Sequence, residues 1–255
     1  MKVFVCVKNV PDTAANIRVV GENGFDESVK FLINPYDEYA IEEAARLVEK
    51  EGGEVVLVTV GKESAIKTVR SALALGSHRA ILVTTDKQFL DSADTAAILQ
   101  KVMEDDGPAD LIFTGKQVVD SETMQTAYRL AEGMDIPITS DVTEFTVAGG
   151  KVSVEREIGG GEREIIEMTM PCIVAASKGL NDPRYPKLPD VMKAKKKEVK
   201  QIALADLELV LSSETELLSL EQVPDRSGAK MIGGSVNEAV AELVKILKED
   251  EKVIA

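Results

Sequence analysis

The sequence predicts an α/β fold: a doubly wound, mostly parallel sheet with helices on both faces, an antiparallel β meander and an extended C-terminal tail. The first part is predicted by short, nearly continuous apolar runs that alternate with amphipathic helical stretches, as in βαβ units. After Pro137 the pattern changes to alternating runs separated by glycines, which is typical of antiparallel hairpins. The last fifty or so residues contain few apolar anchors for a core, which predicts the tail.

The parallel part contains four expected strands, rich in valine, isoleucine and leucine, at Val3–Val7, Val55–Val60, Ala80–Thr84 and Leu111–Thr114. Amphipathic helices are expected at Asp37–Glu51, Lys62–Leu75, Asp91–Glu104 and Ser121–Gly133. In the first helix the apolar residues recur at helical spacing, and Glu42, Glu43 and Arg46 fall on the outer side. The connections between these strands are expected to be right-handed crossovers. In a sheet built in this way, a ligand binds beyond the carboxyl ends of the strands.

The meander is expected over residues 140–170, with strands at Val142–Val147, Val152–Ile158 and Arg163–Met170. A buried strand at Pro171–Ala176 then returns to the main sheet. These elements predict one α/β domain over residues 1–200. Residues 201–255 are expected to form a tail that ends in the helix Val236–Lys248, and long tails of this kind often wrap a partner subunit.

The composition supports a sizeable core and argues against several classes of protein. The chain has 255 residues, of which 44% are hydrophobic, enough for one large domain with appendages. Its formal net charge is -14, and an acidic surface repels the phosphate backbone of nucleic acids. No apolar run approaches the roughly 20 residues of a membrane-spanning helix. We therefore expect no nucleic-acid partner and no direct membrane insertion.

Cys6 and Cys172 are far apart in the sequence, and each lies inside an apolar run. We expect buried free thiols in a reducing compartment, by default the cytoplasm. The single histidine, His78, cannot complete a zinc site with two separate cysteines, and no Gly-x-Ser-x-Gly motif accompanies it. The sequence therefore predicts neither a metal site nor a nucleophile paired with a base.

The familiar phosphate-binding loops are missing. No G-x-x-x-x-G-K-[ST] motif is present, and no G-x-G-x-x-G motif follows the first strand. The glycines of Gly159–Gly161 join two β runs, so they predict a hairpin turn. ATP hydrolysis and ordinary Rossmann dehydrogenase chemistry therefore lack their usual apparatus.

Polar residues open three of the expected helices at the carboxyl edge of the sheet. Asn34 can cap the first helix, Pro35 suits its first position, and Asp37 can reach back to the cap. Ser92–Ala96 is a second polar start. Each is explained by capping alone, but their convergence predicts a nucleotide pocket.

The third start follows the fourth strand. Gly115 allows the backbone to approach a ligand closely, and Asp120 can cap the helix. Thr123, Gln125 and Thr126 lie at the positive end of a helix, where a phosphate is favoured. This arrangement favours binding or redox carriage over hydrolysis.

Several motifs resemble electron-transfer flavoprotein β subunits, and together they cover essentially the whole chain. The longest is LNDPRYPKLPDVMKAKKK, Leu180–Lys197, which resembles the recognition loop of that family. It follows VEREIGGG, Val154–Gly161, at the expected interval. Shorter matches occur in the same order at Val7–Thr13, Asn34–Asp37 and Gly115–Gln117.

This resemblance implies an αβ heterodimer in which the α subunit carries the electron-transferring FAD. The β subunit would bind its own adenine nucleotide and present its recognition loop, residues 179–197, to acyl-CoA dehydrogenases of fatty acid oxidation or related flavoenzymes. Electrons would pass on to a membrane quinone oxidoreductase or to ferredoxin. Leu188 matches the leucine that inserts into the partner, and the same loop supplies Tyr185, Pro189 and Met192 as recognition residues.

The resemblance also implies which residues surround the nucleotide of the β subunit. These are Cys6, Lys8, Asn34, Tyr36, Asp37, Val60, Asp94, Thr95, Gly115, Lys116, Gln117, Asp120, Thr123, Gln125 and Thr126. Ala127 departs from a glycine usual in the family, which narrows the space at this helix start.

Family members differ in the nucleotide that this pocket holds. Simple electron carriers hold AMP with a structural role, whereas electron-bifurcating members hold a second FAD that accepts a hydride from NADH. Val10–Thr13, Asn34–Asp37 and Ala93–Ala96 resemble the bifurcating members, but the recognition loop and VEREI segment resemble the simple carriers. We favour FAD because the first set lines the pocket, and NADH oxidation is expected only if that second FAD is bound.

Two other readings remain open at this point. One is a nucleotide-binding domain of the universal-stress type without a redox role, although it would leave Leu180–Lys197 unexplained and would normally carry a late glycine-rich loop. The other is an enzyme that acts on an adenylated substrate, although Lys8–Ala14 supplies no glycine for a phosphate loop.

Overall fold

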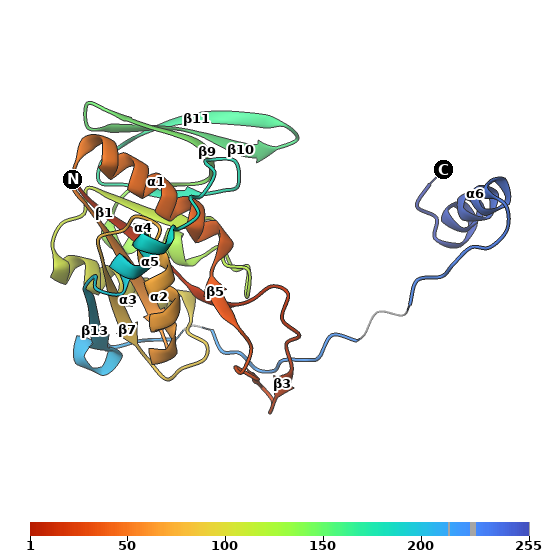
Figure 1. Ribbon diagram of the computed structural model, residues 1–255, viewed down its shortest axis with the longest axis horizontal. Coiled ribbons are helices and arrows are strands. Elements are labelled where there is room, and N and C mark those ends of the chain that lie inside the picture. Colours follow the sequence, from red (N-terminus) through yellow and green to blue (C-terminus); the bar gives the residue numbers. More distant parts are fainter. Residues whose placement is uncertain (214, 225–227, 255) are drawn as a thin grey trace. The chain divides into compact units, whose positions relative to one another are not determined.

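The computed structural model describes residues 1–213, 215–224 and 228–254 of the chain (Figure 1). Two compact units are present, Met1–Leu220 and Glu221–Ala255. The expected boundary at residue 200 falls inside a strand of the first unit, Val199–Ala203. Residues 214, 225–227 and 255 of the expected tail lie outside the described residues.

The first unit is built on a sheet that has nine strands among the described residues, in the order β11-β10-β9-β12-β8-β1-β6-β7-β13. Its parallel strands are β1 (Lys2–Cys6), β6 (Glu54–Gly61), β7 (Arg79–Thr84), β8 (Leu111–Gly115), β12 (Ile173–Ala176) and β13 (Val199–Ala203). The meander adds β9 (Ile138–Ala148), β10 (Lys151–Gly159) and β11 (Glu162–Thr169), with β9 pairing in parallel with β12. The parallel sheet and the antiparallel meander are therefore confirmed.

Helices cover both faces of this sheet, as predicted (Figure 1). One face carries α1 (Pro35–Glu51), α2 (Ile66–Leu73) and α5 (Leu188–Ala194), which enclose Ile41, Leu57 and Phe113. The other carries α3 (Ser92–Asp106) and α4 (Thr126–Met134) around a second core that includes Phe4 and Ile98. Each such buried side chain contributes about 1.5–3 kcal/mol, so both layers are needed to hold the central strands.

The order of the strands reverses at β1. The chain runs from β1 outward to β6 and β7, and then places β8 on the other side of β1. Ligands in doubly wound sheets bind beyond the carboxyl ends of the strands at such a reversal, where the helices diverge to opposite faces. The topology thus directs attention to the ends of β1 and β8, at Cys6 and Gly115.

Several elements differ from the sequence prediction. An arm of short strands, β2 (Asn9–Pro11), β3 (Val19–Val20), β4 (Gly24–Phe25) and β5 (Phe31–Ile33), fills the stretch before α1. The helix α4 begins at Thr126, five residues after the predicted Ser121, because Glu122 and Met124 both adopt a φ of 51° that no helix can include. β13 and α5 were not predicted, since a five-residue edge strand and a seven-residue helix give little periodicity.

The second unit contains α6 (Val236–Lys245), which continues as a π-helical turn over Ile246–Asp250. Ser235 and Glu238 form a capping box, in which Ser235 donates its backbone N–H to Oε2 of Glu238 at 2.8 Å. None of the described residues of α6 is buried. Among the described residues, no helix has the length and apolar character needed to span a lipid bilayer.

Candidate functional site

Two buried polar side chains lie at the junction of β1, β8 and the start of α1. Nδ2 of Asn34 donates to Oδ1 of Asp37 and to the backbone oxygen of Gln117, both at 2.9 Å. Oδ1 of Asn34 accepts from the backbone N–H of Val119 at 3.1 Å. The Asn34 side chain thus fixes the loop that follows β8 to the start of α1.

Asp37 completes this junction. Its carboxylate accepts backbone N–H groups of Lys8 at 2.8 Å and Gly115 at 3.1 Å, besides the amide of Asn34. Burial raises the pKa of Asp37 to about 7, although these three hydrogen bonds favour the charged form. Asp37 therefore holds the ends of β1 and β8 on either side of one helix start.

The predicted cap of α1 has a different geometry. Asn34 is the N-cap residue and Pro35 follows it as expected, but the Asn34 side chain makes no capping bond to the helix. It uses its oxygen on the loop beyond β8, and Asp37 meets the amide of Asn34 instead of the backbone N–H of the cap. The sequence pattern predicts local capping, whereas most contacts of these two side chains reach distant segments of the chain.

Gly115 is required by this junction. A Cβ atom at position 115 would lie 2.4 Å from Oδ1 of Asp37 and 2.7 Å from Cβ of Tyr36. The close approach that we predicted for a ligand is therefore made by the start of α1. Glycine lets β8 end against the helix.

Two lysines frame the same region. Nζ of Lys8 lies 2.7 Å from Oδ2 of Asp120, which links β1 to the loop after β8. Nζ of Lys116 lies 2.9 Å from Oδ1 of Asp141 and 5.5 Å from the centre of the Tyr36 ring. The hydrogen bond to Asp141 raises the pKa of Lys116 above its ordinary value, which shows that the ion pair favours the charged lysine.

The start of α3 is covered by the C-terminal part of the first unit. Asp91 caps α3 by accepting the backbone N–H of Ala93 at 2.6 Å. Asp94, which is buried, accepts the hydroxyl of Ser213 at 2.6 Å, and Thr95 donates its hydroxyl to the backbone oxygen of Asp91 at 2.8 Å. Ser213 is a site residue that the sequence reading missed, because a serine in an irregular stretch carries no pattern.

The start of α4 is more open. Thr123 and Gln125 are exposed, Thr126 is the first helical residue, and no side chain among the described residues caps this first turn. Gln125 accepts the hydroxyl of Ser92 at 2.9 Å, so the starts of α3 and α4 are adjacent. The first turn of α4 therefore offers backbone N–H groups to an anion.

The ends of β1, β6 and β8 contribute apolar and neutral groups. Cys6 and Val60 are partly buried against the core beneath α3 and α4. Burial, and then the nearby charge of Asp37, raise the pKa of the Cys6 thiol far above its ordinary value, so the thiol is neutral. Oγ1 of Thr114 is buried and has no hydrogen-bond partner in the part of the chain that the structure describes.

The predicted recognition residues lie in a different part of the first unit, on the segment that leads into α5. Tyr185 is 92% exposed and Leu188 is 75% exposed, and Pro189 and Met192 are exposed as well. Large apolar side chains gathered in this way do not serve the core, and such surfaces commonly bind other proteins.

Comparison with known proteins gives matches of one kind over most or all of the chain. The family model described as "Electron transfer flavoprotein domain" matches residues 23–207. An electron transfer flavoprotein subunit beta of Bacillus subtilis is 40% identical over 259 residues, with all of both chains covered. The proteins of that name from Bradyrhizobium diazoefficiens and Homo sapiens are 38% and 37% identical, and they cover 100% and 98% of this chain and 100% and 97% of their own length.

Proposed function

Because this chain belongs to the electron transfer flavoprotein β-subunit family, we propose that it works as the smaller subunit of an αβ heterodimer that carries electrons between flavoenzymes. The matches extend over the full chain, which neither the universal-stress reading nor the adenylating-enzyme reading accounts for. The free thiols of Cys6 and Cys172 suit the reducing cytoplasm that we expect.

The observation that carries this proposal is the reversal of strand order between β1 and β8, beside the start of α4, where the N-cap residue Gln125 makes no side-chain capping bond. We propose that an adenine nucleotide, a second FAD or AMP, binds there. Thr123, Gln125, Thr126 and the first turn of α4 would hold its phosphate groups. Cys6, Val60 and the buried hydroxyl of Thr114 would lie beside its rings.

Ten of the predicted site residues then divide into three groups by what they touch. Asn34, Asp37 and Gly115 contact one another and hold the frame. Thr123 and Gln125 are exposed at the rim and would meet the nucleotide. Tyr36, Lys116, Gln117, Lys8 and Asp120 join the frame to the rim through the ion pairs and the loop after β8.

The bound group would decide the chemistry. FAD, when bound, would accept and release electrons, whereas AMP would have a structural role. The chain itself supplies shielding by a neutral thiol, a frame braced by the ion pairs Lys8–Asp120 and Lys116–Asp141, and a helix start for phosphate. A more specific form of this proposal is NADH-dependent electron bifurcation, which requires FAD in this site.

The exposed apolar residues on the segment before and within α5 support docking to an acyl-CoA dehydrogenase or a related flavoenzyme. Leu188, Tyr185 and Met192 would provide the contact, with Pro189 stiffening the chain. The electrons would continue to a quinone oxidoreductase or to ferredoxin.

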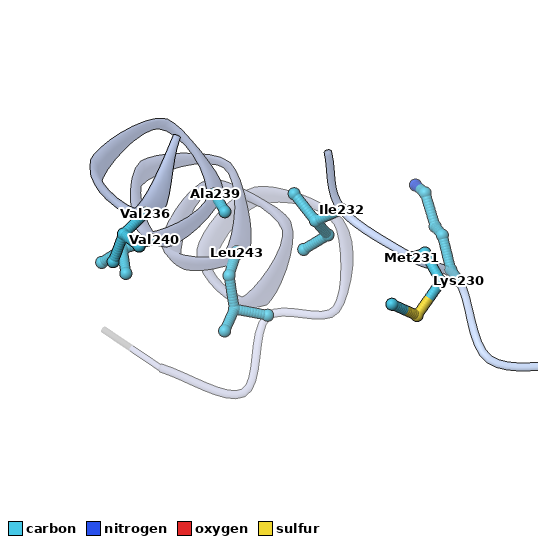
Figure 2. Close-up of a pocket in the computed structure, with 7 residues that line it drawn as sticks. All are labelled: Lys230, Met231, Ile232, Val236, Ala239, Val240 and Leu243. Atoms are coloured by element: carbon cyan, nitrogen blue, oxygen red, sulfur yellow. The ribbon is translucent and has the colours of Figure 1, made fainter. Parts of the chain in front are cut away.

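The second unit supports the proposed heterodimer. Val236, Val240 and Leu243 lie on one face of α6, and Met231 and Ile232 of the preceding segment line the same shallow apolar hollow (Figure 2). None of the described α6 residues is buried, so the described part of this unit leaves the apolar face largely uncovered. We propose that the α subunit covers it.

The nucleotide site can be tested by co-expressing the chain with an α subunit and measuring FAD and AMP per heterodimer after acid release. Two FAD would support the second-flavin form, and one FAD with one AMP would support the simple carrier. The variant Thr126→Glu should lose the β-subunit nucleotide, because the glutamate charge repels phosphate. The helix itself should still form, since a negative charge is favourable at a helix start. Thr126→Ser is the matched control and should retain the nucleotide.

If the Thr126→Glu heterodimer keeps its nucleotide, the phosphate groups do not bind at the start of α4. Failure to form any flavin-containing heterodimer would overturn the proposed function itself.

A further inference from the structure

Residues 181–187 lie outside any helix or strand, yet they are held firmly to α1. Nδ2 of Asn181 donates to the backbone oxygen of Tyr39 at 3.0 Å and to Oε2 of Glu43 at 2.9 Å. Arg46 donates to the backbone oxygen of Asp182 at 3.1 Å. These partners recur at helical spacing, so one polar face of α1 serves as the seat of the segment.

Arg184 is the strongest of these links. Its Nε donates to Oε2 of Glu42 at 2.7 Å, and its backbone N–H donates to the same oxygen at 3.1 Å. Its terminal nitrogens reach both oxygens of Glu49. One guanidinium thus binds two carboxylates that lie about two helical turns apart on α1, in a forked geometry that lysine cannot reproduce.

Glu42 is the buried partner of this link. Its side chain is 3% exposed, in contrast with the outer position that we predicted from the helical pattern. Burial opposes its charge, but the hydrogen bonds from Arg184 and Arg46 hold the pKa of Glu42 below its ordinary value. Removing Arg184 would leave a buried charge with a single arginine partner, which is costly.

The other end of the segment is fastened to α2. Arg70 donates to the backbone oxygens of Ala194 and Lys197. Nζ of Lys197 donates to the backbone oxygens of Leu73 at 2.9 Å and Ser77 at 2.5 Å. The stretch from Tyr185 to Met192 therefore lies between an anchor on α1 and an anchor on α2, two helices that cover the same face of the sheet.

The stretch between these two anchors is also the one that exposes its apolar side chains. Tyr185 is 92% exposed and follows Arg184 directly, and Leu188 comes three residues later. Because these exposed side chains pack little against the rest of the chain, the anchors on α1 and α2 fix their positions. A binding segment held in one conformation loses less entropy on docking than a mobile one.

We propose that Arg184, held by Glu42 and Glu49, is a positioning residue for the docking of the electron-donating dehydrogenase. It does not contact the dehydrogenase through its guanidinium, which faces α1. It acts by presenting Leu188 and Tyr185 in a fixed arrangement. This inference rests on the proposed function of the recognition segment.

The test is a double-mutant cycle on the heterodimer, with an acyl-CoA dehydrogenase that reduces the wild-type protein as the electron donor. Leu188→Ala should raise the apparent KM for the heterodimer by roughly 30-fold, as expected for a hot-spot residue. Arg184→Ala should raise it by about tenfold and leave kcat unchanged, because docking is impaired and the redox centres are untouched. In the Leu188→Ala background, Arg184→Ala should add less than about twofold, since both act through the same contact.

Two further variants separate positioning from stability. Arg184→Lys keeps the charge and a folded protein but loses the fork, and should still raise KM. Arg79→Ala is the matched control: Arg79 also binds two carboxylates, Glu54 and Asp106, but on the side of the sheet that carries α3. It should lower the unfolding temperature with no change in KM.

The positioning role would be overturned if the KM of the double variant rose by the product of the rises of Arg184→Ala and Leu188→Ala. It would also be overturned if Arg79→Ala raised KM as much as Arg184→Ala does. A Leu188→Ala heterodimer with unchanged KM would instead sink the proposed recognition segment, and the inference with it.

Discussion

The backbone N–H of Lys8 donates to Oδ2 of Asp37 at 2.8 Å, so a buried carboxylate joins the end of β1 to the first turn of α1. The other oxygen of Asp37 accepts from Asn34 and Gly115. One side chain thereby sets the spacing of β1 and β8 at the strand reversal where we place the nucleotide. Its protonation links the stability of this junction to pH.

Asp37 should make the protein less stable as the pH rises from about 4 to about 7. Burial raises the pKa of Asp37 to about 7 from an ordinary value of 3.8. In this window the unfolded chain releases the proton of Asp37 while the folded chain keeps it, so rising pH favours unfolding. The full shift corresponds to at most about 4 kcal/mol. Urea unfolding of the wild type and of Asp37→Asn across this range measures it.

The free energy of unfolding of the wild type exceeds that of Asp37→Asn at low pH. This difference should decrease as the pH rises toward 7 and should stay constant above about pH 8. Asp12→Asn is a suitable control. The hydrogen bond from the Ala14 backbone lowers the pKa of Asp12, so its effect should vary only below about pH 4. A constant difference between wild type and Asp37→Asn would show that Asp37 is charged throughout.

Gly115→Ala should destabilise the chain by about 1–3 kcal/mol or more, because its Cβ would overlap Asp37 and the backbone of Tyr36. Gly61→Ala, at the end of β6, is the control, since a Cβ there meets Ala65 at an ordinary 3.7 Å. Chemical unfolding of both variants compares them, and nucleotide content should fall with Gly115→Ala alone. Equal stability of the two variants would mean that the end of β8 shifts without cost.

Much of the fold could be predicted from the sequence because its strands are buried on both faces. Val55–Val60 lies inside β6 and Ala80–Thr84 inside β7, since a continuous valine-rich run is distinctive of parallel strands. β13 escaped prediction because it is an edge strand with the burial pattern of a surface, and only its pairing with β7 makes it a strand.

The sequence predicts that residues from the ends of β1 and β8 and the start of α1 gather in one place, but it does not predict the contacts that their side chains make. Asn34, Asp37 and Gly115 were expected to face a ligand, and they face one another. Glu42 was expected on the outside, and Arg184 covers it. The contacts of Asp37 with Gly115 and of Glu42 with Arg184 join residues far apart in the chain, so they leave no local periodicity and only the three-dimensional structure reveals them.

Ser213→Ala should lower the free energy of unfolding by about 1–3 kcal/mol, because it leaves the buried carboxylate of Asp94 without the 2.6 Å hydrogen bond that it accepts. The double variant with Asp94→Asn should lose less than the sum of the two single variants. Ser219→Ala, in the same irregular stretch, is a comparison that should change little. Additive losses in the Ser213 and Asp94 variants would show that the two side chains act independently.

Substitution of the apolar face of α6 should prevent assembly without unfolding the chain. Val240→Asp with Leu243→Asp places two charges on the face that lines the hollow in Figure 2, and desolvating them at an interface is costly. Since none of the described α6 residues is buried, the variant should keep the thermal unfolding midpoint of the isolated chain. Glu242→Gln, on the same exposed helix, is the control and should assemble normally. Size-exclusion chromatography with an α subunit measures assembly, and a heterodimer of wild-type affinity with the double variant would exclude this face from the interface.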